Sequence, residues 1–370
     1  MWIYENKNWP NFTWDSDLLA IKLAEVRHKQ GRLIGKMESL GFELRQEASL
    51  NILTNDVVNT SAIEGENLNS EEVRSSIARQ LGMDIPDLKD SGRDVDGIVE
   101  IMIDATQGFQ KPLTKERLYD WHAALFPTGR SGMHKITVAG WRTDISGPMQ
   151  VISGPVGRET VHYQAPKAAD VDREMHKFIS WFESSISIDP VLKAGIGHLW
   201  FVTIHPFDDG NGRIGRAIAD MLLTKADGIS ERYYSLSTQI EAERKRYYQI
   251  LETQQRSSLD ITPFLQWFLN CLERAITNSE NILANILLKT KLWDYLNQSP
   301  VNERQKLVIN RMLESTFKGF MNTSKYAKLA KCSTDTALRD IQDLKARGIL
   351  AQNPGGGRST SYRIAIERFE

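Results

Sequence analysis

The stretch HPFDDGNGRIGR, residues 205–216, decides which site this chain builds and which helices must surround it. Gly210 and Gly212 lack a Cβ atom, so the backbone around Asn211 can turn sharply and direct successive N–H groups at an anion. The apolar, helix-forming run Ile214–Leu223 places the N-terminus of a helix beneath the same anion. The pattern therefore predicts a phosphate-binding loop at the start of a helix.

The charged residues of this stretch indicate what kind of phosphate compound it binds. Arg213 and Arg216 are three positions apart and share one helical face, where their forked donors can hold different phosphates of one chain. Asp209 offers the hard oxygen ligand that Mg²⁺ prefers beside phosphate. His205 is the residue best suited to accept a proton near neutral pH. We therefore expect a polyphosphate, a magnesium ion and a general base in one site.

At each fixed position the stretch resembles the Fic motif, HxFx(D/E)GNGRxxR. The resemblance implies an enzyme that transfers part of a nucleotide, usually AMP from ATP, to a hydroxyl group of a protein. It implies His205 as the base for the target hydroxyl, Asp209 as the Mg²⁺ ligand and Phe207 as a buried anchor. It assigns the anion cradle to Gly210, Asn211 and Gly212, the α- and β-phosphates to Arg213, and the γ-phosphate to Arg216. The alternative, a polar loop with a satisfied core histidine, does not account for so many functional side chains at these spacings.

The segment TSAIEG, residues 60–65, resembles the inhibitory motif (S/T)xxxE(G/N) of many Fic proteins. The stretch from Glu47 onward predicts a helix that Gly65 ends, which places Glu64 at the helix C-terminus. The helix dipole disfavours a negative charge there by a few tenths of a kcal/mol up to about one. The resemblance implies that Glu64 pairs with Arg216 and keeps the γ-phosphate from binding productively. The alternative is a solvated glutamate before a helix-ending glycine.

Composition sets limits on the class of protein. A chain of 370 residues exceeds one usual hydrophobic core, so we expect two or three units. A formal net charge of −1 and a pI of about 6.7 indicate no overall preference for nucleic acid. Cys271 and Cys332 are far apart and suggest neither a disulfide framework nor a zinc site. The chain opens without a secretory signal and has no long apolar run, so we expect a cytoplasmic protein that does not enter a membrane.

We predict a mainly α fold: an N-terminal helical region over 1–90, a Fic catalytic core over 91–290 and a winged-helix domain over 300–370. The helices expected before the motif cover residues 16–40, 47–63, 69–81, 94–108, 114–125, 171–184 and 190–204.

Residues 139–166 break the helical pattern with glycines and prolines around the short runs MQVI and TVHYQ, which predicts a β-hairpin. The resemblance implies that this hairpin is the Fic flap, whose exposed edge pairs with an extended segment of the target protein. An ordinary surface hairpin is the alternative.

Three aromatic residues around the motif have open roles. Tyr247 and Tyr248 resemble the pair in Fic domains of which one lies near the nucleoside, and burial of both is an equal alternative. His198 lies two turns before His205, and we expect a core histidine bonded to the backbone rather than a second site residue.

The last seventy or so residues predict three helices over 302–316, 323–330 and 333–347, then strands 349–352 and 360–366 about the turn NPGGGRS, the order of a winged helix. Residues 302–370 hold 13 Lys and Arg against 7 Asp and Glu, an excess of +6 that suits a phosphate backbone. The third helix, however, carries Asp335, Asp340 and Asp343 beside its basic residues. DNA and a protein partner remain equal alternatives for this domain.

Together these patterns predict a protein adenylyltransferase that uses Mg²⁺ and ATP, modifies a hydroxyl-bearing protein and itself, and is restrained by Glu64. Removal of AMP by hydrolysis at the same site is one alternative, because Glu64 could orient water. A DNA-binding regulator that senses nucleotide is another. The target and the oligomeric state, including a homodimer, stay open.

Overall fold

The computed structural model describes residues 1–85, 88–145, 147–154, 157–158, 160–185, 187–298, 300–313, 317, 319–354 and 360–365. The chain forms two compact units, Met1–Ser279 and Glu280–Glu370, and helix α11 (Thr262–Gln298) contributes to both. The N-terminal helical region and residues 91–279 of the predicted catalytic core thus belong to one unit, whereas residues 280–290 belong to the other. The mainly α fold class is confirmed.

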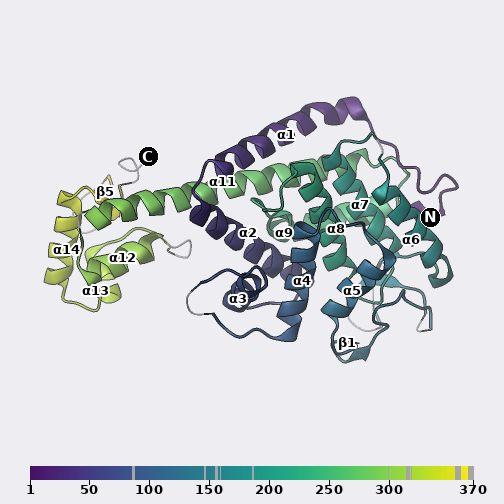
Figure 1. Cartoon of the computed structure of the whole chain (residues 1–370), viewed down its shortest axis with the longest axis horizontal. Helices are drawn as coiled ribbons and strands as arrows, with labels where there is room; N and C mark the ends of the chain where they lie inside the picture. Colours follow the sequence, from purple (N-terminus) through teal and green to yellow (C-terminus); the bar gives the residue numbers. More distant parts are fainter. Residues whose placement is uncertain are drawn as a thin grey trace. The chain divides into compact units, whose positions relative to one another are not determined.

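The first unit is built mainly from helices, and residues 126–167 form a long connection between α5 and α6 (Figure 1). After a short 3-10 helix, η1 (Ile3–Glu5), these helices are α1 (Ser16–Glu38), α2 (Phe42–Ile63), α3 (Ser70–Gln80), α4 (Arg93–Gln107), α5 (Lys115–Leu125), α6 (Ala168–Glu183), α7 (Pro190–Ile204), α8 (Asn211–Asp227), α9 (Leu236–Ala242), α10 (Arg244–Gln255) and the first part of α11.

Helix starts that have a capping side chain are easy to recognise in the sequence. Asp15, Asn69 and Thr114 each accept a hydrogen bond from a backbone N–H in the first turn of α1, α3 and α5. Gly41 and Lys167 precede α2 and α6 without a capping bond from a side chain. The predicted starts of these two helices were therefore a few residues too late.

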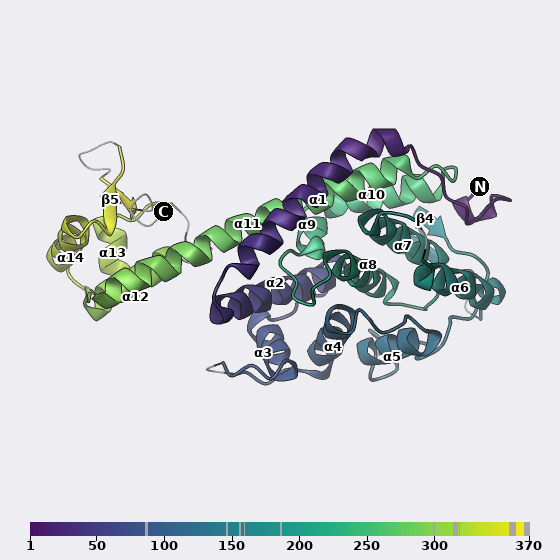
Figure 2. The same ribbon diagram turned by 45° about the horizontal axis from the view of Figure 1, so that its top comes forward.

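Helices α7 and α8 pack against each other at the centre of the first unit, where Figures 1 and 2 both place them. Gly215 of α8 allows this approach, because a Cβ atom there would lie 2.8 Å from Cγ1 of Val202. Phe201 and Ile204 of α7 and Ile214 of α8 are completely buried. The loop that joins these two helices is residues 205–210, so the predicted site stands on two closely packed, buried helices.

Helix α1 runs beside the first part of α11 in both views (Figure 2). Lys22 and Lys29 of α1 each lie within 2.9 Å of a carboxylate oxygen of Glu273.

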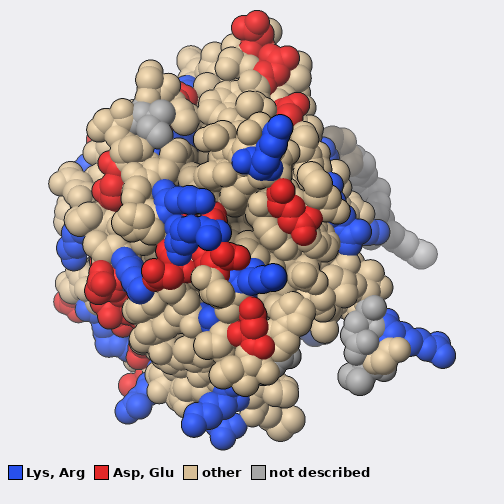
Figure 3. Space-filling model, turned by 90° about the vertical axis from the view of Figure 1, so that its right-hand side faces the viewer, with Lys and Arg blue, Asp and Glu red and all other residues tan. Residues whose placement is uncertain are grey.

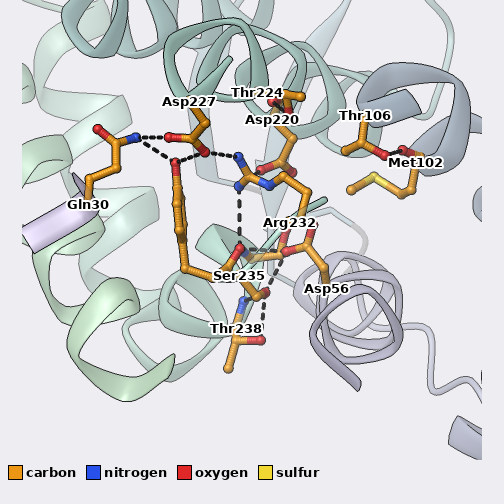
Figure 4. Close-up of polar contacts among 12 residues, drawn as sticks. Gln30, Asp56, Met102, Thr106, Asp220, Thr224, Asp227, Arg232, Ser235 and Thr238 are labelled. Atoms are coloured by element: carbon orange, nitrogen blue, oxygen red, sulfur yellow. Dashed lines mark hydrogen bonds and ion pairs between the residues drawn. The ribbon is translucent and has the colours of Figure 1, made fainter. Parts of the chain in front are cut away.

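A buried polar network joins α1, α2 and α8 to the segment before α9 (Figure 4). Arg232 lies 2.8 Å from Oδ1 of Asp220 and 3.7 Å from Oδ2 of Asp227, both on α8. The Ser235 hydroxyl donates to Asp56 of α2. Gln30 of α1 donates to the Tyr234 hydroxyl at 2.8 Å. Burial raises the pKa of Asp220, and the guanidinium of Arg232 opposes that shift. The network fixes how α2 packs relative to α8.

The hairpin predicted over 139–166 is present as strands β3 (Gln150–Ser153) and β4 (Thr160–Gln164), which pair antiparallel with Val151 opposite Tyr163. Residues 146, 155, 156 and 159 of this segment lie outside the described residues. A second hairpin of two-residue strands, β1 (Arg130–Ser131) and β2 (His134–Lys135), was not predicted, because two residues are too short for an alternating pattern.

The second unit contains α12 (Glu303–Leu313), α13 (Thr323–Leu329), α14 (Thr334–Ala346) and the antiparallel strands β5 (Leu350–Gln352) and β6 (Tyr362–Ile364). Its core includes Val308, Tyr326, Ile341 and Leu344, together with Leu292 of α11. Residues 355–359 of the predicted turn and residue 366 lie outside the described residues. The element order agrees with a winged helix, and that name stays a prediction.

The surface at the right-hand side of Figure 1 carries basic and acidic side chains that are interspersed (Figure 3). Within the described part of the chain, no helix is both long enough and apolar enough to span a bilayer.

Candidate nucleotide site

The loop between α7 and α8 is closed by the side chain of Asn211. Its Oδ1 accepts from the N–H of Phe207 at 2.9 Å, and its Nδ2 donates to the carbonyl of the same residue at 2.8 Å. The Phe207 ring is fully buried and stacks on His122 at 4.3 Å. The amide of Asn211 therefore braces the loop from inside, and only its backbone N–H is left for the predicted anion cradle.

Gly210 has φ +80°, in the left-handed region that favours glycine, and α8 begins directly after it. The first backbone N–H groups of an α-helix have no acceptor within the helix. Those of Asn211, Gly212 and Arg213 thus mark the place for a bound anion, as the sequence predicts.

His205 ends α7 and is held in the protonation state that a base requires. Its Nδ1 lies 3.1 Å from the carbonyl oxygen of Val202. A carbonyl only accepts, so we assign the proton to Nδ1 and a free lone pair to Nε2. Burial lowers the pKa of His205 to about 4, although the bond to Val202 opposes the shift. The imidazole is therefore neutral at physiological pH.

Arg216 is fully buried and is held by the end of α2. Its Nη2 lies 2.8 Å from Oε1 of Glu64 and donates to the carbonyl of Thr60 at 2.8 Å, while its Nε donates to the Thr60 hydroxyl at 2.7 Å. The first and fifth residues of the TSAIEG segment thus meet the last arginine of the HPFDDGNGRIGR stretch.

Glu64 lies directly against the first turn of α8. It follows the last residue of α2, and Gly65 continues with φ +88°. A Cβ atom on Gly212 would overlap Oε1 of Glu64, so this position must be glycine for the carboxylate to approach. A negative group thus already occupies the N-terminal end of α8, which favours anions.

Arg213 pairs with Glu66, a residue that the sequence analysis missed. Its Nη1 lies 2.7 Å from Oε2 of Glu66 and its guanidinium lies over the ring of Phe126. Glu66 stands two residues after Glu64, and its acidic side chain at that offset was the available signal. Both arginines of the site are paired with carboxylates from one short segment.

Asp209 lies at the opening of the loop, and its side chain is 42% exposed. One of its oxygens accepts from the Ser131 hydroxyl, and the other from the N–H of Gly210 at 2.5 Å. Ser131 belongs to the small hairpin that the sequence did not predict. The carboxylate is oriented but remains accessible.

The two tyrosines differ. Tyr247 is buried and its hydroxyl lies 3.0 Å from Nε2 of His198, whose Nδ1 lies 3.0 Å from the carbonyl of Gly215. The expectation of a core histidine at position 198 is thus confirmed. Tyr248 is 38% exposed, and its hydroxyl donates to the carbonyl of Ile63 at 3.1 Å. Of these two rings, only that of Tyr248 is accessible, and its contact with a nucleoside stays a prediction.

Comparisons with known proteins agree with this geometry. Residues 112–223 match the Fic/DOC family, and residues 2–83 match a domain of unknown function, DUF4172. The protein adenylyltransferase Fic of Culex quinquefasciatus is 31% identical over 138 residues, which are 36% of this chain and 26% of that protein. The enzyme of the same name from Aedes aegypti is 34% identical over 113 residues, 30% of this chain and 21% of that protein. The chain thus matches about a quarter of the length of these relatives.

Two crystal structures share the fold at low identity. A Fic family protein from Desulfovibrio desulfuricans G20 has a TM-score of 0.50 and 19% identity, covering 93% of this chain and 95% of that one. A Fic domain containing signaling protein from Bacteroides thetaiotaomicron VPI-5482 has a TM-score of 0.50 and 18% identity, covering 70% and 95%. The matched range includes the loop, the hairpin of β3 and β4, all of α7 and most of α8, so residues 112–223 of this chain are a Fic/DOC family domain.

Proposed function

We propose that this chain transfers AMP from ATP to a Ser, Thr or Tyr hydroxyl of a protein. The observation that carries the proposal is the loop of residues 205–210, which ends a helix with a neutral imidazole and starts another helix whose N-terminus is flanked by two buried arginines. The relatives named protein adenylyltransferase support it.

The reaction uses each group for one task. Nε2 of His205 takes the proton of the target hydroxyl, and that oxygen attacks the α-phosphorus of ATP. The bond from the α-phosphorus to the bridging oxygen breaks, and pyrophosphate leaves. Arg213 and Arg216 balance the charge of the phosphates, which is the main requirement of in-line phosphoryl-type transfer.

A magnesium ion fits this site through Asp209. Its carboxylate is accessible, and no group of three or more metal-binding side chains occurs among the described residues. Mg²⁺ is commonly held by one or two carboxylates together with substrate phosphates, so the remaining ligands would come from ATP and water. When bound, the ion neutralises charge on the phosphates.

We also propose that Glu64 restrains the enzyme and that Tyr248 stacks on the adenine. Glu64 holds Arg216 and covers the first turn of α8, so ATP must displace the carboxylate before its γ-phosphate can bind there. The exposed ring of Tyr248 lies beside the end of α2, next to the same carboxylate.

Labelled ATP tests the proposal in the Glu64→Gly variant. The α-label should stay on protein and the γ-label should not. His205→Ala should abolish transfer yet leave ATP binding nearly intact, because the base acts on the target hydroxyl. Retention of the γ-label, or a His205→Ala rate above about a hundredth of the parent, would contradict the assignment.

Hydrolytic removal of AMP is a second reaction that this site supports, because the Glu64 side chain is 29% exposed beside the phosphate position and can orient water. Incubation of purified AMP-modified protein with the enzyme distinguishes removal of AMP from its transfer. Release of AMP by the wild type and not by Glu64→Gly would make removal the main activity.

We further propose that the second unit binds duplex DNA, because two of the three aspartates of α14 are bonded to other side chains of the unit. Asp340 is buried, lies 3.0 Å from Arg304 and accepts from Asn302 and Tyr326. Asp343 accepts from Gln305 at 2.7 Å. The exposed face of α14 carries Arg339, Gln342 and Lys345, which suit phosphate and base contacts. Asp340 and Asp343 are therefore bonded within the fold, whereas Asp335, in the first turn of α14, is exposed.

A gel-shift assay of the full chain at stated salt tests this. Arg339→Ala with Lys345→Ala should weaken binding and reduce its salt dependence, whereas Lys111→Ala, an exposed lysine of the first unit, should not. If no DNA binds and the double variant instead lowers modification of a protein target, the surface is a protein-docking site.

A further inference from the structure

Arg142 is a buried arginine outside the motif whose hydrogen bonds converge on the His205 loop. It lies between β2 and β3 and is 3% exposed. Its Nε donates to the carbonyl of His205 at 2.7 Å, and its backbone N–H donates to the carbonyl of Pro206 at 2.9 Å. One residue thus binds two consecutive carbonyls of the catalytic loop.

The same guanidinium also reaches the base of the flap. Its Nη2 donates to the carbonyl of Pro166, which follows β4, and its Nη1 lies 3.2 Å from Asp144. Asp144 in turn accepts from the N–H of Ala168, the first residue of α6, at 2.8 Å. Arg142 therefore connects the flap, the start of α6 and the loop that carries the base.

The backbone of His205 needs such support. Its φ of +53° is in the left-handed region, which costs a residue with a Cβ atom about 1 kcal/mol or more. The bond from Arg142 fixes the carbonyl of this residue, and the bond between Nδ1 and Val202 fixes its ring. Loss of the first bond allows the peptide to rotate and carries the imidazole with it.

We infer that Arg142 is a positioning residue that orients His205 as the base and couples that orientation to the flap. This inference rests on the proposed transfer reaction for its kinetic test.

The charge of Arg142 also acts on the pKa of His205, which can be measured separately from the position of the ring. The charged groups that act on His205 are Arg142, which favours the neutral ring, and Glu64 and Asp209, which favour the protonated ring. Removing the guanidinium therefore raises the pKa of His205, whereas a lysine at the same position preserves the charge. A purely structural residue elsewhere has no such effect.

Three variants in the Glu64→Gly background separate charge, geometry and general stability. Arg142→Met removes the charge and the side-chain hydrogen bonds but keeps the backbone bond to Pro206. Arg142→Lys keeps the charge but cannot span the carbonyls of His205 and Pro166 together. The matched control is Arg117→Met, which removes another largely buried arginine that binds the carbonyls of Asp104, Gly108 and Lys111 far from the loop in sequence.

We expect Arg142→Met to lower the maximal automodification rate about tenfold or more, as a displaced base predicts, with the half-saturating ATP concentration changed less than about twofold. The pH midpoint of the rate should move upward. Arg142→Lys should lower the rate without moving that midpoint. Arg117→Met should change neither by more than about twofold.

NMR titration of the His205 ring, assigned with His205→Ala, provides a readout that does not depend on activity. Its midpoint should rise in Arg142→Met and stay in Arg142→Lys. If the Glu64→Gly parent transfers no AMP, the proposed function fails, but the titration still tests the contact of Arg142 with His205. If Arg142→Met has the same transfer rate and the same His205 titration midpoint as the parent, the inference is overturned. If Arg142→Met does not fold, a wild-type rate in Arg142→Lys would overturn it.

Discussion

At the scale of single residues, Arg216 is where the proposed inhibition and the proposed binding of the γ-phosphate meet. A buried guanidinium must keep charged or polar partners, and Thr60 and Glu64 of one segment bind Arg216 beside the Tyr247 side chain. A γ-phosphate can replace the carboxylate because it offers the same charge to the same fork. The site is thus built to exchange one anion for another.

Glu64→Gly should raise automodification tenfold or more if the lost pair is worth about 1.4 kcal/mol, because Arg216 becomes available to ATP. Adding Arg216→Ala should cancel the gain, so the two substitutions should be strongly non-additive. Rates at saturating ATP and Mg²⁺ for the wild type, both single variants and the double variant measure this. A Glu64→Gly protein no faster than wild type would rule out the inhibitory role.

Glu66→Gln should act on ATP affinity rather than on maximal rate, because Glu66 occupies Arg213 and not Arg216. The Glu66 side chain is 51% exposed, so the pair is worth at most about 1 kcal/mol and the half-saturating ATP concentration should fall about two- to fivefold. Glu100→Gln, an exposed glutamate of α4, is the control. An unchanged half-saturation would show that Arg213 is equally available with Glu66 in place.

At the scale of elements, the contact between α7 and α8 sets the geometry of the loop they share. Gly215→Ala should destabilise the protein by about 1–3 kcal/mol, because the new methyl group would press on Val202 and on Phe201 in a packed core. Urea unfolding measures this. Gly31→Ala is the matched control: its Cβ would meet open space in α1, and it should stabilise by up to about 1 kcal/mol. Equal effects of the two substitutions would contradict close packing at Gly215.

At the scale of the whole molecule, buried histidines make folding sensitive to acid. Burial lowers the pKa of His122, His198 and His205 to about 4. The unfolded chain binds these protons at about pH 6.5, so between the two values it holds more protons than the folded one. Each histidine therefore removes stability as the pH falls from about 6.5 towards 4.

His198→Gln isolates one of these contributions from the buried carboxylates, whose raised pKa values act in the opposite direction. The stability of the wild type relative to this variant should fall by about 1.4 kcal/mol per pH unit between about pH 6 and 5. Urea unfolding of both proteins across that range gives the difference. A constant difference would mean that His198 binds its proton equally well in the folded and unfolded states, so that its pKa is not lowered by folding.

The sequence alone predicted the helices that precede the motif and the hairpin within residues 139–166, and the resemblance to Fic proteins implied the pairing of Glu64 with Arg216; α9, α10 and α11 were not predicted. Apolar spacing and capping residues such as Asp15 and Thr114 act locally, and the phosphate-loop residues lie within one short stretch. Helix starts without a capping side chain, as at Gly41, and the two-residue strands at Arg130 had no such local signal.

Only the tertiary structure decided which distant side chains reach the loop. Arg142 and Glu66 look like ordinary charged residues in the sequence, and their roles follow from packing that brings them against His205 and Arg213. The inward turn of Asp340 and the burial of Tyr247 likewise depend on neighbours contributed by other helices. Local patterns specify helices and their ends, whereas contacts between side chains far apart in the chain exist only once those helices pack.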